Sequence, residues 1–400
     1  MKKISALLIC LLSIHFSNAQ DRVITTGVPF LLVAADARSA SMGDNGVATS
    51  PDAYSQQWNP AKYAFSAEKQ GFALSYTPYL TQLVNDISLA QVTYYNRFQE
   101  RMSFAASIRY FSLGEIELRQ NFDDPANVVK PSELAIDLSY ALHLSDHFAM
   151  SVAGRYISSN LQIQSENNDA TAAHTFAVDV SGFYQSEEIA FSEFNGKYRL
   201  GFNFQNLGPK ISYTKNQSDI NANFLPANMK LGGGFDFILD EYNKVALNLE
   251  FDKLLVPTPQ IPKAPIDANG DGDFDDVGDT NAAEQRAQNN LEYNQVGWTS
   301  GIFKSFGDAP DGFSEELKEF TYSVGAEYSY QDSFAFRLGY FNESPIKGAR
   351  RFFALGAGFK YNIVKVDLSY LFSASKVKNP LENTLRFSLS FAFGDKYDDL

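Results

Sequence analysis

The stretch Leu385-Arg386-Phe387-Ser388-Leu389-Ser390-Phe391-Ala392-Phe393 places an aliphatic or aromatic residue at every second position. Successive side chains of a β-strand point to opposite faces of the sheet, so this period of two predicts a strand with one apolar face. Similar segments recur from about Gly71 to Phe393, and Tyr and Phe cluster at their ends. Aromatic girdles at strand ends are typical of transmembrane β-barrels. The pattern therefore predicts an all-β chain, either a membrane barrel or a large soluble β-sandwich.

The N-terminus favours the barrel because it has the composition of a secretory signal peptide. Lys2 and Lys3 form a positive region, Ile4–Leu12 forms an apolar core, and Ser17-Asn18-Ala19 offers a small-residue cleavage site. The apolar run is too short for a spanning helix, although a retained anchor is the alternative. We therefore predict a signal peptide over residues 1–19 and a barrel in the cell outer membrane.

Composition excludes several classes of function. The net charge is -14, which argues against binding nucleic acid. Cys10 is the single cysteine and lies within the predicted signal, so the exported chain has no disulfide and no cysteine nucleophile. No Gly-x-Ser-x-Gly nucleophile motif occurs either. We therefore expect a protein that is not an enzyme.

The connections between the alternating segments predict the number of strands. Bacterial barrels have an even number of strands, short periplasmic turns and long outer loops. The tight turns Asp240–Asn243 and Gln331–Ser333 should both be periplasmic, so an even number of strands separates them. We therefore assign Gln295–Ser305 to one long outer loop, Leu254–Lys318. This leaves about fourteen antiparallel strands over residues 71–393, a tail at residues 394–400, and both termini in the periplasm.

Residues 20–70 do not alternate, and their small residues and glycines suit close packing inside a barrel. We predict that this segment is a plug, or hatch, within the lumen. The residues that define it are Asp36, Arg38, Met42, Gly43, Trp58, Asn59 and Pro60.

These residues carry a resemblance to a known family. The stretch from Asp36 to Gly43, followed by Trp58-Asn59-Pro60-Ala61, resembles the hatch of fatty-acid-transporter-like (FadL-like) outer-membrane barrels. It is more closely similar to their PorV branch, a component of the type IX secretion system of Bacteroidetes. One departure is that residues 394–400 follow Phe393, so the chain does not end on an aromatic residue. Further matching stretches are Ser305–Pro310, Gly325–Tyr328, Arg337–Phe341, Lys347–Arg350 and Pro380–Phe387.

The resemblance implies a function in protein secretion. The barrel would bind exported cargo through the cargo's C-terminal signal domain, associate with a large translocon barrel, and hand the cargo to a sortase-like surface protease. Capture would use the long outer loop, although that loop could instead only cover the mouth of the barrel. The candidate partner-binding residues in the loop are Phe306, Asp308, Pro310, Phe313, Glu315 and Glu316.

Two other functions remain open. A FadL-like transporter of hydrophobic small molecules would need a kinked strand that opens sideways, and Gly232–Gly234 could supply the kink. The acidic outer loop disfavours this interpretation, because it is a poor landing site for a hydrophobic molecule. An enzyme acting on lipid or lipopolysaccharide would need a serine or metal constellation, and we find none with suitable spacing.

Two charged stretches are candidate binding sites. Oxygen ligands at alternate positions around Gly272 resemble the first half of a calcium loop, in which calcium would stiffen the outer loop. The twelfth position is Gly278 where a calcium loop has Glu, so a solvated acidic turn is the alternative. The basic cluster Lys347–Arg351 could meet lipopolysaccharide phosphates or a partner's acids, or it is an ordinary barrel rim. The candidate calcium ligands are Asp267, Asn269, Asp271, Asp273 and Asp275.

Overall fold

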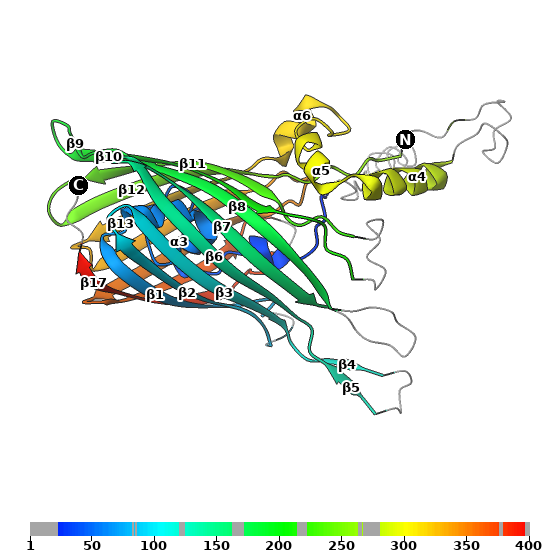
Figure 1. The fold of residues 1–400 in the computed structure, drawn as a ribbon, viewed down its shortest axis with the longest axis horizontal. Helices are drawn as coiled ribbons and strands as arrows, with labels where there is room; N and C mark the ends of the chain where they lie inside the picture. Colours follow the sequence, from blue (N-terminus) through cyan, green and yellow to red (C-terminus); the bar gives the residue numbers. More distant parts are fainter. Residues whose placement is uncertain are drawn as a thin grey trace, which may run out of the picture.

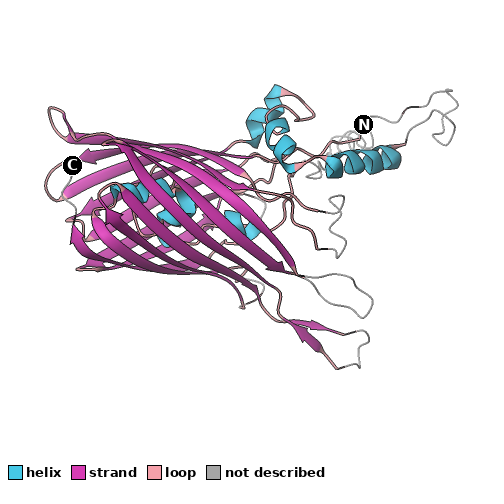
Figure 2. Ribbon diagram, viewed as in Figure 1, coloured by secondary structure: helices cyan, strands magenta, loops and turns pink. Residues whose placement is uncertain are grey.

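The computed structural model describes residues 23–81, 84, 86–119, 125–161, 172–213, 222–262, 266, 281–375 and 379–396. Within these residues, fourteen strands form a closed antiparallel barrel, as the alternation predicts (Figures 1 and 2). The first strand pairs with the last, and β10 pairs with β11. In sheet order they are β1 (Glu68–Pro78), β2 (Ile87–Gln99), β3 (Met102–Leu113), β6 (Ser132–Ser145), β7 (Phe148–Asn160), β8 (Ala173–Gln185), β10 (Asn195–Leu207), β11 (Asn228–Ile238), β12 (Asn243–Leu254), β13 (Thr321–Tyr330), β14 (Phe334–Asn342), β15 (Arg351–Tyr361), β16 (Val364–Ser373) and β17 (Leu385–Lys396).

The last strand shows how the alternation is used. Leu385 and Phe387 are 43% and 47% exposed on the outer face, whereas Arg386 between them is 1% exposed and faces the lumen. The outer face therefore presents apolar side chains to the bilayer, and the lumen collects the polar ones. Two short strands, β4 (Ile116–Leu118) and β5 (Asn127–Val129), form a separate sheet, and the short β9 (Ile189–Ala190) pairs with the start of β10.

The connection between β12 and β13 is the long outer loop, and it is helical where it is described. Its elements are α4 (Ala282–Gln295), α5 (Trp298–Lys304), α6 (Phe313–Glu316) and η4 (Leu317–Glu319). Residues 295–305 are therefore not a strand, as the parity of the turns requires. Figure 1 shows α5 and α6 standing beside the barrel mouth, with α4 extending beyond it. In the part of the chain that the structure describes, no helix is both long and apolar enough to cross a membrane.

Residues 23–67, here called the lumenal segment, precede β1 and lie inside the barrel (Figures 1 and 2). The segment contains η1 (Pro29–Leu32), α2 (Ala37–Ser41), α3 (Ser55–Trp58) and η2 (Pro60–Phe65). Near its start, the Gly27 N–H donates a hydrogen bond to the carbonyl of Phe224. Phe224 lies in the long connection between β10 and β11, at the outer end of the barrel. Near its end, the Ser66 carbonyl accepts from Arg97, beside the short β2–β3 turn. The segment therefore runs from the outer mouth to the periplasmic end.

This path corrects one prediction. The end of β17 lies at the periplasmic end with the short turns, as expected, but the first described residues do not. Val23, Ile24, Thr25 and Thr26 line a cavity at the outer mouth. The prediction that both ends of the chain are periplasmic is therefore wrong for these residues, because strand parity constrains only where β1 begins.

The predicted kink at Gly232–Gly234 is also wrong. β11 pairs with β10 and β12 in one unbroken register through all three glycines. Two of them face the lumen instead, where a Cβ on Gly234 would lie 3.0 Å from the Ala48 carbonyl oxygen. The missing side chains therefore make room for the lumenal segment and do not bend the strand.

Candidate functional site

Two motifs of the lumenal segment meet at Asp36. Its carboxylate accepts a hydrogen bond from the Ser39 backbone N–H at 2.8 Å and another from the Trp58 indole N–H at 2.7 Å. An Asp at this N-cap position satisfies a backbone donor that the first turn of α2 leaves unpaired. All three residues are buried. The contact therefore fixes the start of α2 against α3.

Arg38 ties the lumenal segment to the barrel wall. Its guanidinium donates to both carboxylate oxygens of Glu327 on β13, at 3.1 and 3.0 Å, and to Asp52 at 2.7 Å. Glu327 also pairs with Arg337 on β14, which lies 2.7 Å from Asp367 on β16. A bidentate Arg–carboxylate pair fixes orientation as well as charge. This charge network therefore links the segment to three strands of the wall.

The adjoining strands β11 and β12 hold the backbone of the segment. Glu250 on β12 accepts hydrogen bonds from the N–H groups of Gly46 and Val47 at 2.7 and 2.8 Å. Lys230 on β11 lies 3.0 Å from the Glu250 carboxylate and balances its charge. Buried backbone donors need such partners, because an unpaired one costs about 1–3 kcal/mol.

The Asn59-Pro60 turn is a third anchor. The Asn59 amide donates to the carbonyls of Val47 and Gly182, both at 2.9 Å, and its oxygen accepts from the Ala61 N–H. Pro60 begins η2, where its fixed φ suits the first turn and its missing N–H is not needed. The turn therefore joins two parts of the segment to β8.

Met42 and Gly43 press directly on the backbone of the wall. Gly325 on β13 and Gly339 on β14 face the lumen, and a Cβ on either would lie within 2.6 Å of Met42 atoms. Gly43 has φ +78° and lies against the backbone of Tyr340. Only glycine permits such an approach. This role of Gly325 and Gly339 was not predicted, although a glycine at a lumen-facing position of the alternation is a signal for it.

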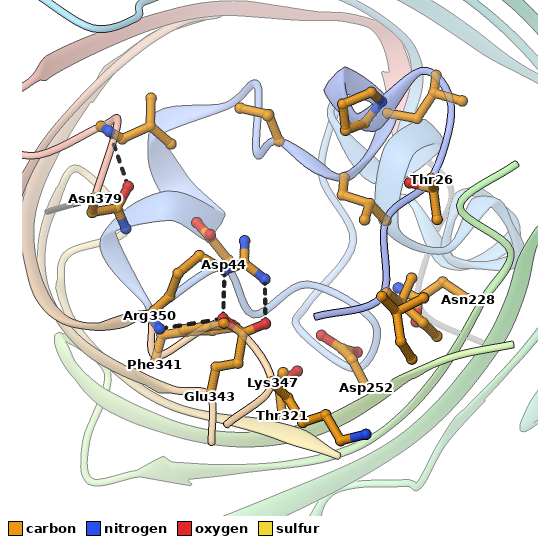
Figure 3. A pocket seen from close by; sticks show the side chains of 18 of the residues that line it. Thr26, Asp44, Asn228, Asp252, Thr321, Phe341, Glu343, Lys347, Arg350 and Asn379 are labelled. Atoms are coloured by element: carbon orange, nitrogen blue, oxygen red, sulfur yellow. Dashed lines mark hydrogen bonds and ion pairs between the residues drawn. The ribbon is translucent and has the colours of Figure 1, made fainter. Parts of the chain in front are cut away.

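A cavity of about 500 Å³ lies between the lumenal segment and the outer loops (Figure 3). Asp44 and Trp58 belong to its floor, and charged residues of the strands and loops line its sides. Most of these charges are paired within the chain: Arg350 donates to Glu343 at 2.9 and 3.0 Å, and Lys230 lies 2.9 Å from Asp252. Apolar side chains such as Leu31, Tyr79 and Phe352 line it as well. The cavity is therefore a vestibule with both charged and apolar walls, and its floor is the lumenal segment.

The long outer loop is fastened to the barrel rim by a second charge cluster, here called the loop latch. It consists of Lys253, Glu315, Glu316, Glu319 and Lys347, all of them buried. Lys347 lies 2.8 Å from both Glu315 and Glu319, and Lys253 lies 3.2 Å from Glu316. Lys253 also binds Glu319. The latch therefore holds α6 and η4 on the ends of the strands.

The pKa values of two loop carboxyl groups reflect these contacts. Burial acts to raise the pKa of Glu319, but hydrogen bonds from Lys253, Lys347 and Thr258 hold it below its usual 4.5. A lowered pKa stabilises the folded loop above about pH 4.5, and this contribution is lost as the pH falls through the lowered value. Burial raises the pKa of Asp308 to about 6, because it favours the neutral carboxyl group. The folded loop therefore loses stability as the pH rises through 6 and the buried group becomes charged.

We expect Lys347→Gln to release the latch. The substitution leaves Glu315 and Glu319 short of a buried positive charge, a change that costs about 3–5 kcal/mol in comparable pairs. Amide hydrogen exchange of α6 and η4, measured by mass spectrometry, should become at least about tenfold faster. Lys318→Gln is the matched control, because Lys318 is an exposed lysine of η4. Equal exchange in the two variants would show that the latch does not hold the loop.

Comparison with known proteins identifies the family. The family model described as type IX secretion system protein PorV matches residues 16–261, which is more than half of the chain. The chain belongs to the PorV family. It is therefore an outer-membrane component of the type IX secretion system. No curated protein matches the chain.

One solved structure shows the same fold at low identity, and others resemble this chain less. The toluene transporter TodX of P. putida has a TM-score of 0.50 at 11% identity and covers 90% of this chain and 99% of its own. The toluene transporter TbuX of Ralstonia pickettii has a TM-score of 0.48 at 12% identity, covering 91% and 100%. A Pseudomonas aeruginosa FadL homologue has a TM-score of 0.42 at 10% identity, covering 91% and 99%. The predicted resemblance to the PorV family is confirmed, and the barrel shares the fold of TodX.

The predicted loop residues of this PorV-family barrel separate into two groups. Phe306 and Phe313 are 50% and 77% exposed, whereas Glu315 and Glu316 are buried in the loop latch. The two glutamates therefore support the loop from beneath and do not face a partner. Asp308 and Pro310 are half-buried between the groups. Other exposed apolar residues of the loop, which were not predicted, include Phe303 and Leu317.

The charged candidates have different outcomes. The calcium ligands proposed between Asp267 and Asp275 lie outside the described residues. Among the residues that the structure describes, no group of three or more His, Cys, Asp or Glu side chains could hold a metal ion. In the basic cluster, Lys347 and Arg350 are paired with carboxylates of this chain. These two charges therefore have partners within the barrel rim, and contact of the cluster with lipopolysaccharide phosphates stays a prediction.

Proposed function

We propose that this barrel captures exported cargo at its outer mouth, receives it from the large translocon barrel, and carries it through the membrane plane to a sortase-like surface protease. The observation that supports capture is the loop patch, defined as the exposed side chains of Phe303, Phe306, Phe313 and Leu317. Exposed aromatic anchors are typical of binding hot spots. The cargo would present its C-terminal signal domain to this patch.

The setting of the loop patch supports its role as a binding surface. Phe313 and Leu317 are four positions apart in consecutive helical turns, so their side chains share one face. The Lys253 ammonium group of the loop latch lies 5.9 Å from the centre of the Phe306 ring. The latch thus holds the patch in place before cargo arrives, which lowers the entropy lost on binding.

The filled lumen fits the same function. The lumenal segment is anchored by charge pairs, hydrogen bonds and close backbone contacts, so cargo would ride on the outside of the barrel. We propose binding and release without a chemical step, and therefore no enzymatic activity. Calcium bound in the outer loop remains a proposal, with stiffening of the loop as its effect.

A transporter of hydrophobic small molecules is the second candidate, because TodX is a toluene transporter and shares the fold. One observation disfavours it here. β11 keeps its register through the glycines that would have to bend. A hydrophobic ligand would therefore find no sideways exit at that strand.

The test is a detergent pull-down of the tagged barrel from its native outer membrane, followed by mass spectrometry. We expect a very large barrel and exported proteins that share a C-terminal domain. Replacing both Phe303 and Phe313 with Ser should reduce cargo recovery at least about tenfold, since each anchor contributes about 1 kcal/mol or more. Tyr242→Ser is the matched control, an aromatic residue 53% exposed on a periplasmic turn. Unchanged cargo recovery, or a barrel that carries only stoichiometric small hydrophobic molecules, would contradict the proposal.

A further inference from the structure

The outer wall of the barrel carries a hollow where β2, β3, β6 and β7 run side by side. Its volume is about 450 Å³, within the range of about 300–1,000 Å³ that is typical of ligand pockets. Almost all of its lining is apolar. The side chains around it are Tyr94, Phe104, Ala106, Leu138, Tyr140 and Val152.

The hollow follows from strand register. Ala106 on β3 pairs with Tyr94 on β2 and with Leu138 on β6, so one small side chain stands between two large ones. In the neighbouring row, Phe104 pairs with Tyr140, and the two ring centres lie 5.0 Å apart. The register of β3 with β2 and β6 is unbroken through these rows. The hollow is therefore a depression in the wall and not a passage through it.

The hollow lies in the periplasmic half of the wall. Phe104 is two residues from the start of β3 at Met102, and a strand rises about 3.4 Å per residue. The short turn before β3 exposes Glu100 and Arg101, one acidic and one basic side chain. An apolar hollow at this depth, below a turn with both charges, faces the inner leaflet of the outer membrane, which consists of phospholipid.

We propose that the hollow holds one acyl chain of a zwitterionic phospholipid. The chain would contact apolar walls on several sides, whereas an ordinary bilayer-facing strand offers contact on one side only. Arg101 suits the phosphate of the headgroup, because a guanidinium binds phosphate oxygens in pairs. Glu100 suits an ammonium group on the same headgroup. This lipid site lies on the opposite face of the wall from the lumenal segment, and it does not depend on the proposed capture of cargo.

The test measures the lipid retained by the barrel after detergent exchange, by native mass spectrometry with identification of the released lipid. We expect about one zwitterionic phospholipid per wild-type barrel. Ala106→Phe fills the hollow and should lower its retention about tenfold. Ala357→Phe is the matched control, because Ala357 is a bilayer-facing alanine on β15 that pairs with Phe336 and Leu368. It should retain the lipid.

Two further variants test the same site in case Ala106→Phe does not fold. Phe104→Ala removes one wall of the hollow and should also lower retention, while Arg101→Gln should weaken the preference for phosphate-bearing lipid. Absence of retained lipid from the wild type, or equal retention in Ala106→Phe, would overturn the proposal. So would retention of lipopolysaccharide, of a free fatty acid, or of a protein in place of phospholipid.

Discussion

Replacing Arg38 with Gln is expected to destabilise the barrel strongly and to loosen its lumen. The substitution removes the positive charge that Glu327 and Asp52 share, at 3.0 and 2.7 Å. Removing one partner of a buried ion pair typically costs about 3–5 kcal/mol. Glu327 keeps Arg337 as a partner, so we expect the lower end of this range. We expect a lower midpoint of thermal unfolding in detergent, followed by circular dichroism. We also expect a higher ion conductance in planar bilayers than that of the wild type.

Two variants separate this effect from a general loss of surface charge. Arg119→Gln breaks an exposed pair with Glu117, which spans 3.1 Å, and should change stability by less than about 1 kcal/mol. Arg38→Gln combined with Glu327→Gln should recover part of the loss, since Arg337 keeps Asp367 as a partner. If Arg38→Gln leaves both the unfolding midpoint and the conductance unchanged, the charge network does not hold the lumenal segment.

The buried position of Arg38 also limits what can replace it. Lysine would keep the charge, but it cannot place two donors on one carboxylate in a fixed plane. Arg38→Lys should therefore recover only part of the stability. This expectation distinguishes a requirement for geometry from a requirement for charge alone.

The barrel could be predicted from the sequence because its wall obeys a simple rule. A period of two determines which face each side chain takes, and the short turns must all lie at one end. The turns at 240–243 and 331–333 therefore excluded an additional strand at Gln295–Ser305, where the structure has helix. The path of the lumenal segment follows no such rule. Its outer start depends on contacts such as that between Gly27 and Phe224, which lie far apart in the sequence.

The roles of particular residues were harder to predict for the same reason. The pattern at Phe313–Glu316 indicates an exposed loop, and the sequence alone could not separate its two faces. Glu315 and Glu316 turn toward lysines of β12 and of the β14–β15 connection, whereas Phe313 turns outward. Acidic residues are usually exposed, so their burial becomes visible only when the partners Lys253 and Lys347 are placed.

The glycines of the wall lead to the second large effect. Gly339→Ala adds one Cβ, and the atoms nearest to it belong to the backbone of Met42 and Gly43. The added Cβ would lie 2.6 Å from the Cα of Met42. A flexible side chain could move away, but the backbone there is fixed by α2 and by the Arg38 network. Overpacking of this kind costs about 1–3 kcal/mol, and more where neighbours cannot relax. We expect the upper end of this range, together with displacement of residues 42–43 from the wall.

Thermal unfolding and amide exchange of the lumenal segment measure these two effects separately. Gly154→Ala is the matched control, because Gly154 faces the bilayer on β7 and its added Cβ would have no heavy atom within 4 Å. That change should be neutral in both measurements. A loss of stability without faster exchange in the lumenal segment would mean that the backbone of β14 moves and the segment keeps its position. Faster exchange in the lumenal segment with an unchanged unfolding midpoint would mean that the barrel wall is rigid and the segment moves. The position of the segment would then depend on its contacts with the strands that surround it.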